Sequence, residues 1–253
     1  MKIAVCIKQV PTREWQPRLS DDKTWIREQD VSYEMNEPDA YALEEALRLR
    51  ERHGGEVVAC SAGPARVQQI LREALARGAD RALHVESDAL AAADAFVTGT
   101  ALAGAMADEK FDLVLTGLQS DDQGHAQTGV VLAERLGIPH STIIMEVQVE
   151  DGRLRVKREL EGGWFQWIAM PLPALLTIQS GINQLRYATL KGIMAAKKKE
   201  IRQVQPPAGL QPSQRIVTLA MPARTKETQI IGGSPSEAAK ELVRRLRDEA
   251  RAL

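Results

Sequence analysis

The chain has 253 residues and a mass of 27.8 kDa, with 44% hydrophobic and 26% charged residues. This composition is ordinary for a globular protein and excludes disorder along the whole chain, because the apolar residues can offset the entropy lost on folding. Aromatic residues make up only 4%, too few for a stacking surface that binds single-stranded nucleic acid, and no apolar run approaches the roughly 20 residues of a membrane span. The two cysteines exclude a disulfide framework, and the N-terminus lacks a signal-peptide pattern, so a cytoplasmic protein is expected.

Charge is unevenly distributed, although the net charge is only −1. Residues 185–253 carry 14 Lys or Arg against 6 Asp or Glu, whereas residues 1–184 carry 19 against 28. The C-terminal part is therefore either a solvated basic tail or a basic arm that docks on an acidic partner, and the charge count leaves both open.

The first 140 residues alternate between two patterns. Short runs rich in β-branched residues predict buried strands, and the longer segments between them predict helices that end at glycine. The predicted strands are residues 2–10, 56–63, 81–87 and 112–117, and the predicted helices are residues 35–55, 65–80, 94–110 and 127–137. In the first helix, Asn36 is expected to cap the helix or to shape the turn before it, and Glu44 and Arg48 are expected to pair on the outer face.

The pattern changes after Pro139. Residues 141–150 and 152–160 flank Asp151–Gly152, a strong hairpin signal, and residues 162–170 and 173–179 predict two further strands. Residues 203–214 are Pro-rich and extended, and residues 234–253 predict a C-terminal helix. The fold class is therefore α/β, with a doubly wound, mostly parallel sheet, added antiparallel strands and an extended C-terminal arm.

One loop is the best candidate for a ligand site. Open α/β sheets bind ligands beyond the carboxyl ends of their strands, where this chain places residues 6–11, 36–39, 61–64 and 117–129. The last segment, GLQSDDQGHAQTG, ends in Gln127, Thr128 and Gly129 at a predicted helix N-terminus, which suits a phosphate. Asp121 and Asp122 are expected to take hydroxyl or amide partners instead, and an ordinary polar loop explains the same residues.

No set of residues indicates a catalyst acting alone. The chain has no GxGxxG after the first strand, no GxxxxGK[ST] and no GxSxG, and its four histidines show no metal-ligand spacing. Cys6 and Cys60 fall on predicted buried strands and are expected to be inert. No nucleophile, base and orienting group can be assembled, so catalysis by this chain is the weaker hypothesis.

The segment QLRYATLKGIMAAKKKEI combines exposed-type apolar residues with cations. Tyr187, Leu190, Ile193 and Met194 lie among Arg and Lys residues, an arrangement in which the apolar groups anchor a partner and the charges steer it. A short amphipathic helix packed on its own domain explains the segment equally well, and the residues leave both open.

Several motifs in one order resemble the beta subunit of electron transfer flavoprotein over nearly the full chain. They are VCIKQVP, NEPDAYALEEALRLRE, SAGP before ARGADRALHV, GLQSDDQGHAQTG, VKRELEGGWFQWIAMPLPALLT and RYATLKGIMAAKKK. The first helix motif and RELEGG are closer to the bacterial members that pair with trimethylamine dehydrogenase.

The resemblance implies a heterodimer with an alpha subunit that mainly holds one FAD, while this chain holds AMP. It also implies transient docking of flavin-containing dehydrogenases and electron delivery to the membrane's electron transfer flavoprotein–quinone oxidoreductase, with no nucleic acid partner and no membrane-embedded segment. Carried over by position, the AMP contacts are Cys6, Asn36, Glu37, Pro38, Asp39, Ala62, Asp122, Gln123, Gly124, His125, Ala126, Gln127, Thr128, Gly129, Val130, Val131, Leu132 and Ala133. The docking residues are Tyr187, Leu190, Ile193 and Met194.

The same resemblance divides the chain into a nucleotide-binding domain at 1–182, a docking segment at 183–202 and a C-terminal arm and helix at 203–253 that contact the alpha subunit. Two other hypotheses remain open. One is a bifurcating relative with a second FAD in place of AMP, and the other is an adenine-nucleotide-binding protein that acts alone. The bifurcating members tend to carry DTAQVGP in the loop, whereas this chain has HAQTGVV, which favours AMP.

Overall fold

The computed structural model describes residues 1–150, 152–222 and 228–253. Two compact units are present, residues 1–218 and residues 219–253, and each is described by itself. The predicted docking segment at 183–202 belongs to the first unit. Asp151, the first residue of the predicted hairpin turn, lies outside the described residues, and Gly152 beside it has a φ of 74°.

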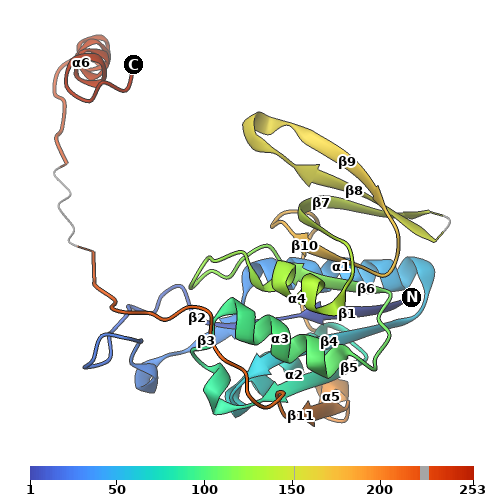
Figure 1. Ribbon diagram of the computed structural model, residues 1–253. Helices are drawn as coiled ribbons and strands as arrows, with labels where there is room; N and C mark the ends of the chain where they lie inside the picture. The colour runs from blue at the N-terminus through green and yellow to red at the C-terminus, as the bar shows by residue number, and fades with distance from the viewer. Residues whose placement is uncertain (151, 223–227) are drawn as a thin grey trace. The chain divides into compact units, whose positions relative to one another are not determined.

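Within the described residues, nine strands form one sheet in the order β11-β5-β4-β1-β6-β10-β7-β8-β9 (Figure 1). The strands from β11 to β7 run parallel, and β8 and β9 extend one edge in antiparallel fashion. A separate antiparallel pair is formed by β2 and β3. The strands are β1 Lys2–Cys6, β2 Gln9–Pro11, β3 Tyr33–Met35, β4 Glu56–Gly63, β5 Arg81–Glu86, β6 Leu113–Gly117, β7 His140–Glu150, β8 Arg153–Glu159, β9 Phe165–Met170, β10 Ala174–Ile178 and β11 Ile201–Val204.

Side chains alternate between the two faces along each strand, so both faces of the sheet carry apolar groups. Helices cover both faces and bury these groups. On β1, Ile3 and Val5 pack in one core with α1 and α2, whereas Ala4 and Cys6 pack in a second core with α3 and α4. The α-helices of this unit are α1 Glu37–His53, α2 Gln68–Arg77, α3 Ala95–Met106, α4 Thr128–Leu136 and α5 Leu190–Ala196. Short 3-10 helices lie at Glu28–Asp30, Ala65–Val67, Asp88–Leu90 and Glu161–Gly163. The predicted doubly wound α/β class is confirmed.

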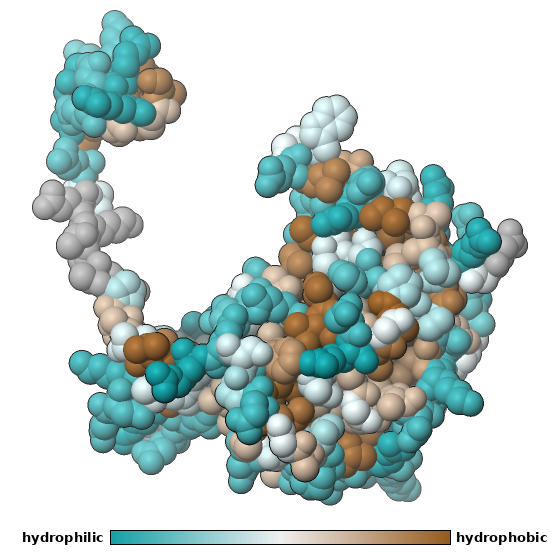
Figure 2. Space-filling view, viewed as in Figure 1, coloured by the Kyte–Doolittle hydropathy of each residue, from teal (hydrophilic) through white to brown (hydrophobic). Residues whose placement is uncertain are grey.

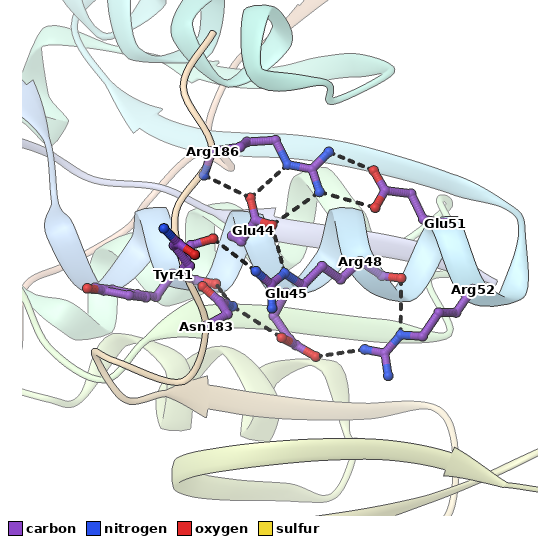
Figure 3. Close-up of polar contacts among 9 residues, drawn as sticks. Tyr41, Glu44, Glu45, Arg48, Glu51, Arg52, Asn183 and Arg186 are labelled. Atoms are coloured by element: carbon purple, nitrogen blue, oxygen red, sulfur yellow. Dashed lines mark hydrogen bonds and ion pairs between the residues drawn. The ribbon is translucent and has the colours of Figure 1, made fainter.

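Helix α1 is covered on both sides. Its apolar stripe is buried against the sheet, as predicted. The predicted pair on the other side also forms, since Arg48 Nε donates to Glu44 Oε1 at 2.8 Å. Glu44 is nevertheless buried, because residues 183–186 lie over this side of the helix (Figure 3). The expectation of a solvent-facing pair is therefore wrong for the glutamate.

Two strands differ from the sequence prediction. The strand predicted at 2–10 ends at Cys6, because the backbone N–H of Lys8 donates to the Asp39 carboxylate instead of to a neighbouring strand, and β2 then pairs with β3. The weakly patterned region after residue 183 contains α5 and also β11, which pairs in parallel with β5 at the sheet edge. The four residues of β11 are too few to show a periodic pattern that would predict a strand.

The second unit contains α6 Pro235–Asp248, the predicted C-terminal helix. Ser234 and Glu237 form a reciprocal capping box at its start. Leu242 and Val243 are exposed, and hydrophobic and hydrophilic side chains occupy separate sides of the helix (Figure 2). In the part of the chain that the structure describes, no helix is long and apolar enough to span a membrane.

Candidate functional site

The four predicted ligand-binding segments meet at one place. From β1 the chain proceeds to β4 and β5 on one side, then returns to β6 on the other side of β1. A reversal of this kind leaves a crevice outside the carboxyl ends of the strands. Residues from 6–11, 36–39, 61–64 and 117–129 line a cleft there, so their predicted convergence is confirmed.

The predicted AMP residues fall into two groups. Those that line the cleft are Cys6, Asn36, Asp39, Ala62, Asp122, Gln123, His125, Ala126, Gln127, Thr128 and Gly129. Those outside its lining are Glu37, Pro38, Gly124, Val130, Val131, Leu132 and Ala133. Leu132 and Ala133 pack in the core beneath α4. Contact of AMP with either group stays a prediction.

Asp39 joins the ends of two strands at the cleft. Its Oδ2 accepts from the N–H of Lys8 at 2.7 Å, just after β1, and its Oδ1 accepts from the N–H of Gly117 at 2.7 Å, at the end of β6. Burial raises the pKa of Asp39 to about 6, although these two amides favour the ionised carboxylate. Both oxygens are engaged within the protein, so this side chain positions the cleft walls.

Asn36 ties the long loop after β6 to the start of α1. Its side chain does not cap the helix. Instead, Nδ2 donates to Gln119 O at 3.0 Å, and Oδ1 accepts from Asp121 N at 2.9 Å. Asp121 Oδ2 in turn accepts from Glu37 N at 3.3 Å, the kind of amide partner that was predicted. Of the two predicted roles for Asn36, shaping the turn is the observed one.

Lys8 places a cation beside the same loop. Its Nζ donates to Asp122 Oδ1 at 2.7 Å, to Gln123 Oε1 at 3.0 Å and to Ser120 Oγ at 3.3 Å. Asp122 therefore has an ammonium partner, which was not predicted. It also accepts from the backbone N–H of Gln123 at 2.8 Å, an amide partner of the predicted kind. Lys8 lines the cleft, and its ammonium group is paired there with Asp122.

The N-terminus of α4 opens on the cleft. Gln127, Thr128 and Gly129 line it, and Gln127 gives the helix no side-chain cap. In contrast, Asp94 and Thr189 cap α3 and α5 through their side chains. The first N–H groups of an α-helix have no intrahelical acceptor, so those of α4 are donors for a ligand.

Gly129 also has a packing role. A Cβ at this position would lie 2.7 Å from Thr116 Oγ1 and 2.9 Å from Thr177 Cγ2, which are on β6 and β10. The missing side chain lets the first turn of α4 lie directly on the sheet. Glycine is therefore required here by packing, besides its predicted place at a phosphate site.

Part of the cleft comes from segments outside the prediction. These segments contribute Trp25 and Tyr33 before α1, Arg66 after β4, and Leu90 after β5. The Arg66 guanidinium stacks on the Tyr33 ring, 4.1 Å from its centroid. The strand-end rule, applied to β5 as well, would have identified Leu90, whereas residues 12–33 carry no periodic signal.

The predicted docking residues lie on α5 and just before it. Tyr187, Leu190, Ile193 and Met194 are all exposed. The opposite side of α5 packs on α2, where Ala196 is buried. The segment is thus a short helix packed on its own domain, as one interpretation predicted, and it also displays apolar side chains. Docking of a partner on them stays a prediction.

Both cysteine side chains are buried, which disfavours reaction of their thiols. Cys6 and Cys60 are free and buried, as predicted. Burial raises the pKa of both thiols, to about 12 for Cys60, and keeps them neutral. Among the residues that the structure describes, no three His, Cys, Asp or Glu side chains gather to hold a metal ion.

These features define a doubly wound α/β protein with a cleft at its switch point and a helix that displays apolar side chains. A family model described as the electron transfer flavoprotein domain matches residues 23–208. The chain is 38% identical to electron transfer flavoprotein subunit beta of Methylophilus methylotrophus, covering 95% of this chain and 96% of that protein. It is 38% identical to the subunit beta of Thermoanaerobacterium thermosaccharolyticum, with 97% and 98% covered, and 34% identical to the human one, with 99% and 98% covered. The chain belongs to the electron transfer flavoprotein family, as the resemblance predicts.

Proposed function

We propose that this chain is the beta subunit of a heterodimeric electron carrier, with AMP in the cleft at the end of β1 and β6. The alpha subunit mainly holds the FAD, which supplies the redox chemistry, and this chain helps to enclose it. Flavin-containing dehydrogenases dock at Leu190 and reduce the FAD, which then passes electrons to the quinone oxidoreductase of the membrane. The chain itself contributes binding and positioning.

The N-terminus of α4 at the switch point is the observation that carries the AMP proposal. Its uncapped N–H groups suit a phosphate, and Thr128 offers a hydroxyl group in the same place. The cleft also has apolar side chains, Val67, Leu90 and Leu102, that suit the faces of a purine. Lys8 adds positive charge for the anion. These residues fit a mononucleotide in both polarity and charge.

The cofactor content tests this assignment. Co-expressed alpha and beta subunits are purified, denatured, and their released nucleotides are identified by mass spectrometry and absorption. We expect one AMP and one FAD per heterodimer. Two FAD and no AMP would contradict the assignment and select a bifurcating carrier, whereas an absent alpha subunit and release of ADP from added ATP would select a nucleotide-binding protein that acts alone.

The docking role has a separate test. Leu190→Ala removes the exposed apolar group at the start of α5, and its effect is measured as electron transfer from trimethylamine dehydrogenase to the heterodimer. We expect a higher KM for the heterodimer with unchanged FAD content. Transfer kinetics equal to those of the wild type would refute docking through Leu190.

A further inference from the structure

The chain just before the docking helix is fastened to α1. Figure 3 shows residues of α1 meeting Asn183 and Arg186 along one side of the helix. Asn183 Nδ2 donates to Tyr41 O at 3.2 Å and to Glu45 Oε2 at 3.1 Å. Arg48 Nη2 donates to the carbonyl oxygen of residue 184 at 3.0 Å. Four successive residues, 183–186, therefore follow the surface of α1.

Arg186 makes the most extensive of these contacts. Its Nε and Nη2 donate to the two carboxylate oxygens of Glu44 at 2.7 and 3.1 Å. Its Nη1 and Nη2 donate to the two oxygens of Glu51 at 2.6 and 3.2 Å. The backbone N–H of Arg186 also donates to Glu44 at 3.3 Å. One guanidinium group thus bridges two carboxylates that lie seven residues apart on the same helix.

The chemistry of this bridge requires arginine. Only 4% of the Glu44 side chain is exposed, and its burial is matched by two cations, Arg186 and Arg48. Burial by itself raises the pKa of Glu44, but the hydrogen bonds from both arginines bring that pKa below its usual range. A planar guanidinium can donate hydrogen bonds to two carboxylates at once in a fixed geometry, whereas a lysine ammonium is a compact charge without that planar set of donors.

The other end of the docking helix is fastened to α2. Arg72 Nη1 donates to the carbonyl oxygens of Ala196 and Lys199, each at 2.7 Å. Lys199 Nζ donates back to Leu75 O at 3.1 Å. Between the attachments at 183–186 and 196–199, the backbone of α5 lies directly on α2, since a Cβ on Gly192 would be 2.3 Å from Ala76 O. The helix is held without using its exposed side chains.

The side chains displayed between the two attachments are largely free of contact. Tyr187 is 91% exposed, Leu190 83% and Met194 71%. Thr189 caps α5 by accepting from Gly192 N at 3.0 Å, so the first turn that carries Leu190 is itself ordered. Bulky apolar groups are therefore presented on a backbone that is fixed on both sides.

We propose that Arg186 is a positioning residue for partner docking: by bridging Glu44 and Glu51 it holds the segment of Tyr187, Leu190 and Met194 in its binding conformation before a partner arrives. This inference rests on the proposed docking function. A segment held in advance loses little conformational freedom on binding, so more of the apolar contact energy remains as affinity. Arg186 contributes without touching the partner, through the segment that follows it.

The experiment uses the co-purified heterodimer with three changes in this chain. Arg186→Ala removes the bridge, and Arg186→Lys keeps the positive charge without the planar guanidinium. Glu51→Gln removes the charge and one acceptor oxygen of the more exposed partner. Arg52→Ala is the matched control, because it deletes a cation on the same side of α1, and the described contacts of Arg52 are with Arg48 O and Glu45 of that helix itself. Hydrogen exchange of peptides covering 183–196 is followed by mass spectrometry without any dehydrogenase, and transfer from a flavin-containing dehydrogenase that reduces the wild-type heterodimer is measured separately.

For Arg186→Ala we expect amide exchange in 183–192 to be about tenfold faster, because the equilibrium constant for local opening of this segment should rise about tenfold. The KM for the heterodimer should rise by a similar factor, about tenfold, while kcat and FAD content stay within a factor of about two. Arg186→Lys should recover only part of the protection, and Glu51→Gln should show a smaller change of the same kind. Arg52→Ala should match the wild type.

Several results would overturn the inference. Fast exchange of 183–196 in the wild-type heterodimer would show that the segment orders only on binding. Unchanged exchange in both Arg186→Ala and Glu51→Gln would show that the bridge holds nothing, and full rescue by Arg186→Lys would show that charge alone suffices. Loss of FAD from Arg186→Ala would assign it to assembly instead. Failure of the docking function itself is distinguished by Leu190→Ala, whose unchanged kinetics would refute docking whatever the exchange data show.

Discussion

Asp39→Asn tests how the cleft walls are held. In the wild type, one carboxylate oxygen accepts from Lys8 N and the other from Gly117 N, each at 2.7 Å. An asparagine keeps one acceptor oxygen and turns its NH₂ group toward the second backbone N–H, so two donors face each other. Loss of a hydrogen bond to a charged group costs about 1.5–3 kcal/mol.

The opposing effect is the cost of the buried charge. Burial raises the pKa of Asp39 to about 6 from its ordinary 3.8, which corresponds to roughly 3 kcal/mol. Because the folded-state pKa is higher than the unfolded-state pKa, the folded protein binds the proton more tightly, and stability falls as pH rises from about 4 to about 6. The asparagine does not titrate. The stability advantage of the wild type over Asp39→Asn should therefore be largest near pH 4, where Asp39 is protonated, and smallest near pH 7, where it carries a buried charge.

Urea unfolding followed by circular dichroism, at several values from pH 4 to pH 7.5, measures this difference. The stability of the wild type minus that of Asp39→Asn should fall by up to roughly 3 kcal/mol over this range. Asp108→Asn, at an exposed position after α3, controls for the change in net charge. A difference that does not vary with pH would refute the assignment of a titrating, buried Asp39.

Three further predictions concern other residues of this chain. Gly129→Ala places a Cβ 2.7 Å from Thr116 Oγ1, so it should lower the free energy of unfolding by about 1–3 kcal/mol and reduce the AMP released from the heterodimer, whereas Gly232→Ala, with open space around its Cβ, should change neither. Lys8→Gln removes an ammonium group from the cleft and should lower AMP retention without changing the far-ultraviolet circular dichroism; normal AMP content would show that this ammonium does not serve the ligand. Cys60 should resist Ellman's reagent at pH 8 until urea unfolds the protein, because burial keeps its thiol neutral, and rapid labelling of the folded protein would contradict this.

The strand and helix order could be predicted because each element carries its own periodic pattern. Residues 56–63 are apolar on both faces, as a central parallel strand requires, and the helix from Glu37 shows a buried stripe and an opposite polar side. Strand-end geometry then placed the ligand cleft, since the loop at 117–129 follows a buried strand and precedes a helix. These inferences depend only on neighbours within a few residues and on general rules of sheet topology.

The polar contacts that shape the site could not be predicted in the same way. Asn36 and Asp39 are predicted AMP contacts from the resemblance, a prediction that stays open, but no local pattern predicted that their side chains would bind Gln119, Lys8 and Gly117. Arg186 likewise appeared as one cation among several, and its partners lie 135 and 142 residues away. A charged residue pairs with whatever the fold brings within reach, and no local pattern encodes that.

The amino-acid order alone therefore predicted the layered α/β architecture and the sheet edge at which the cleft lies, because apolar periodicity and turn residues act over short distances along the chain, whereas the family followed from motifs that resemble those of its relatives. Tertiary packing decided which side of α1 would be covered, which carboxylates would be consumed as structural acceptors, and that the helix bearing Leu190 would be fixed at both ends. The physical reason is that desolvation and hydrogen-bond partners depend on distances in space, which exist only once the strands and helices have come together.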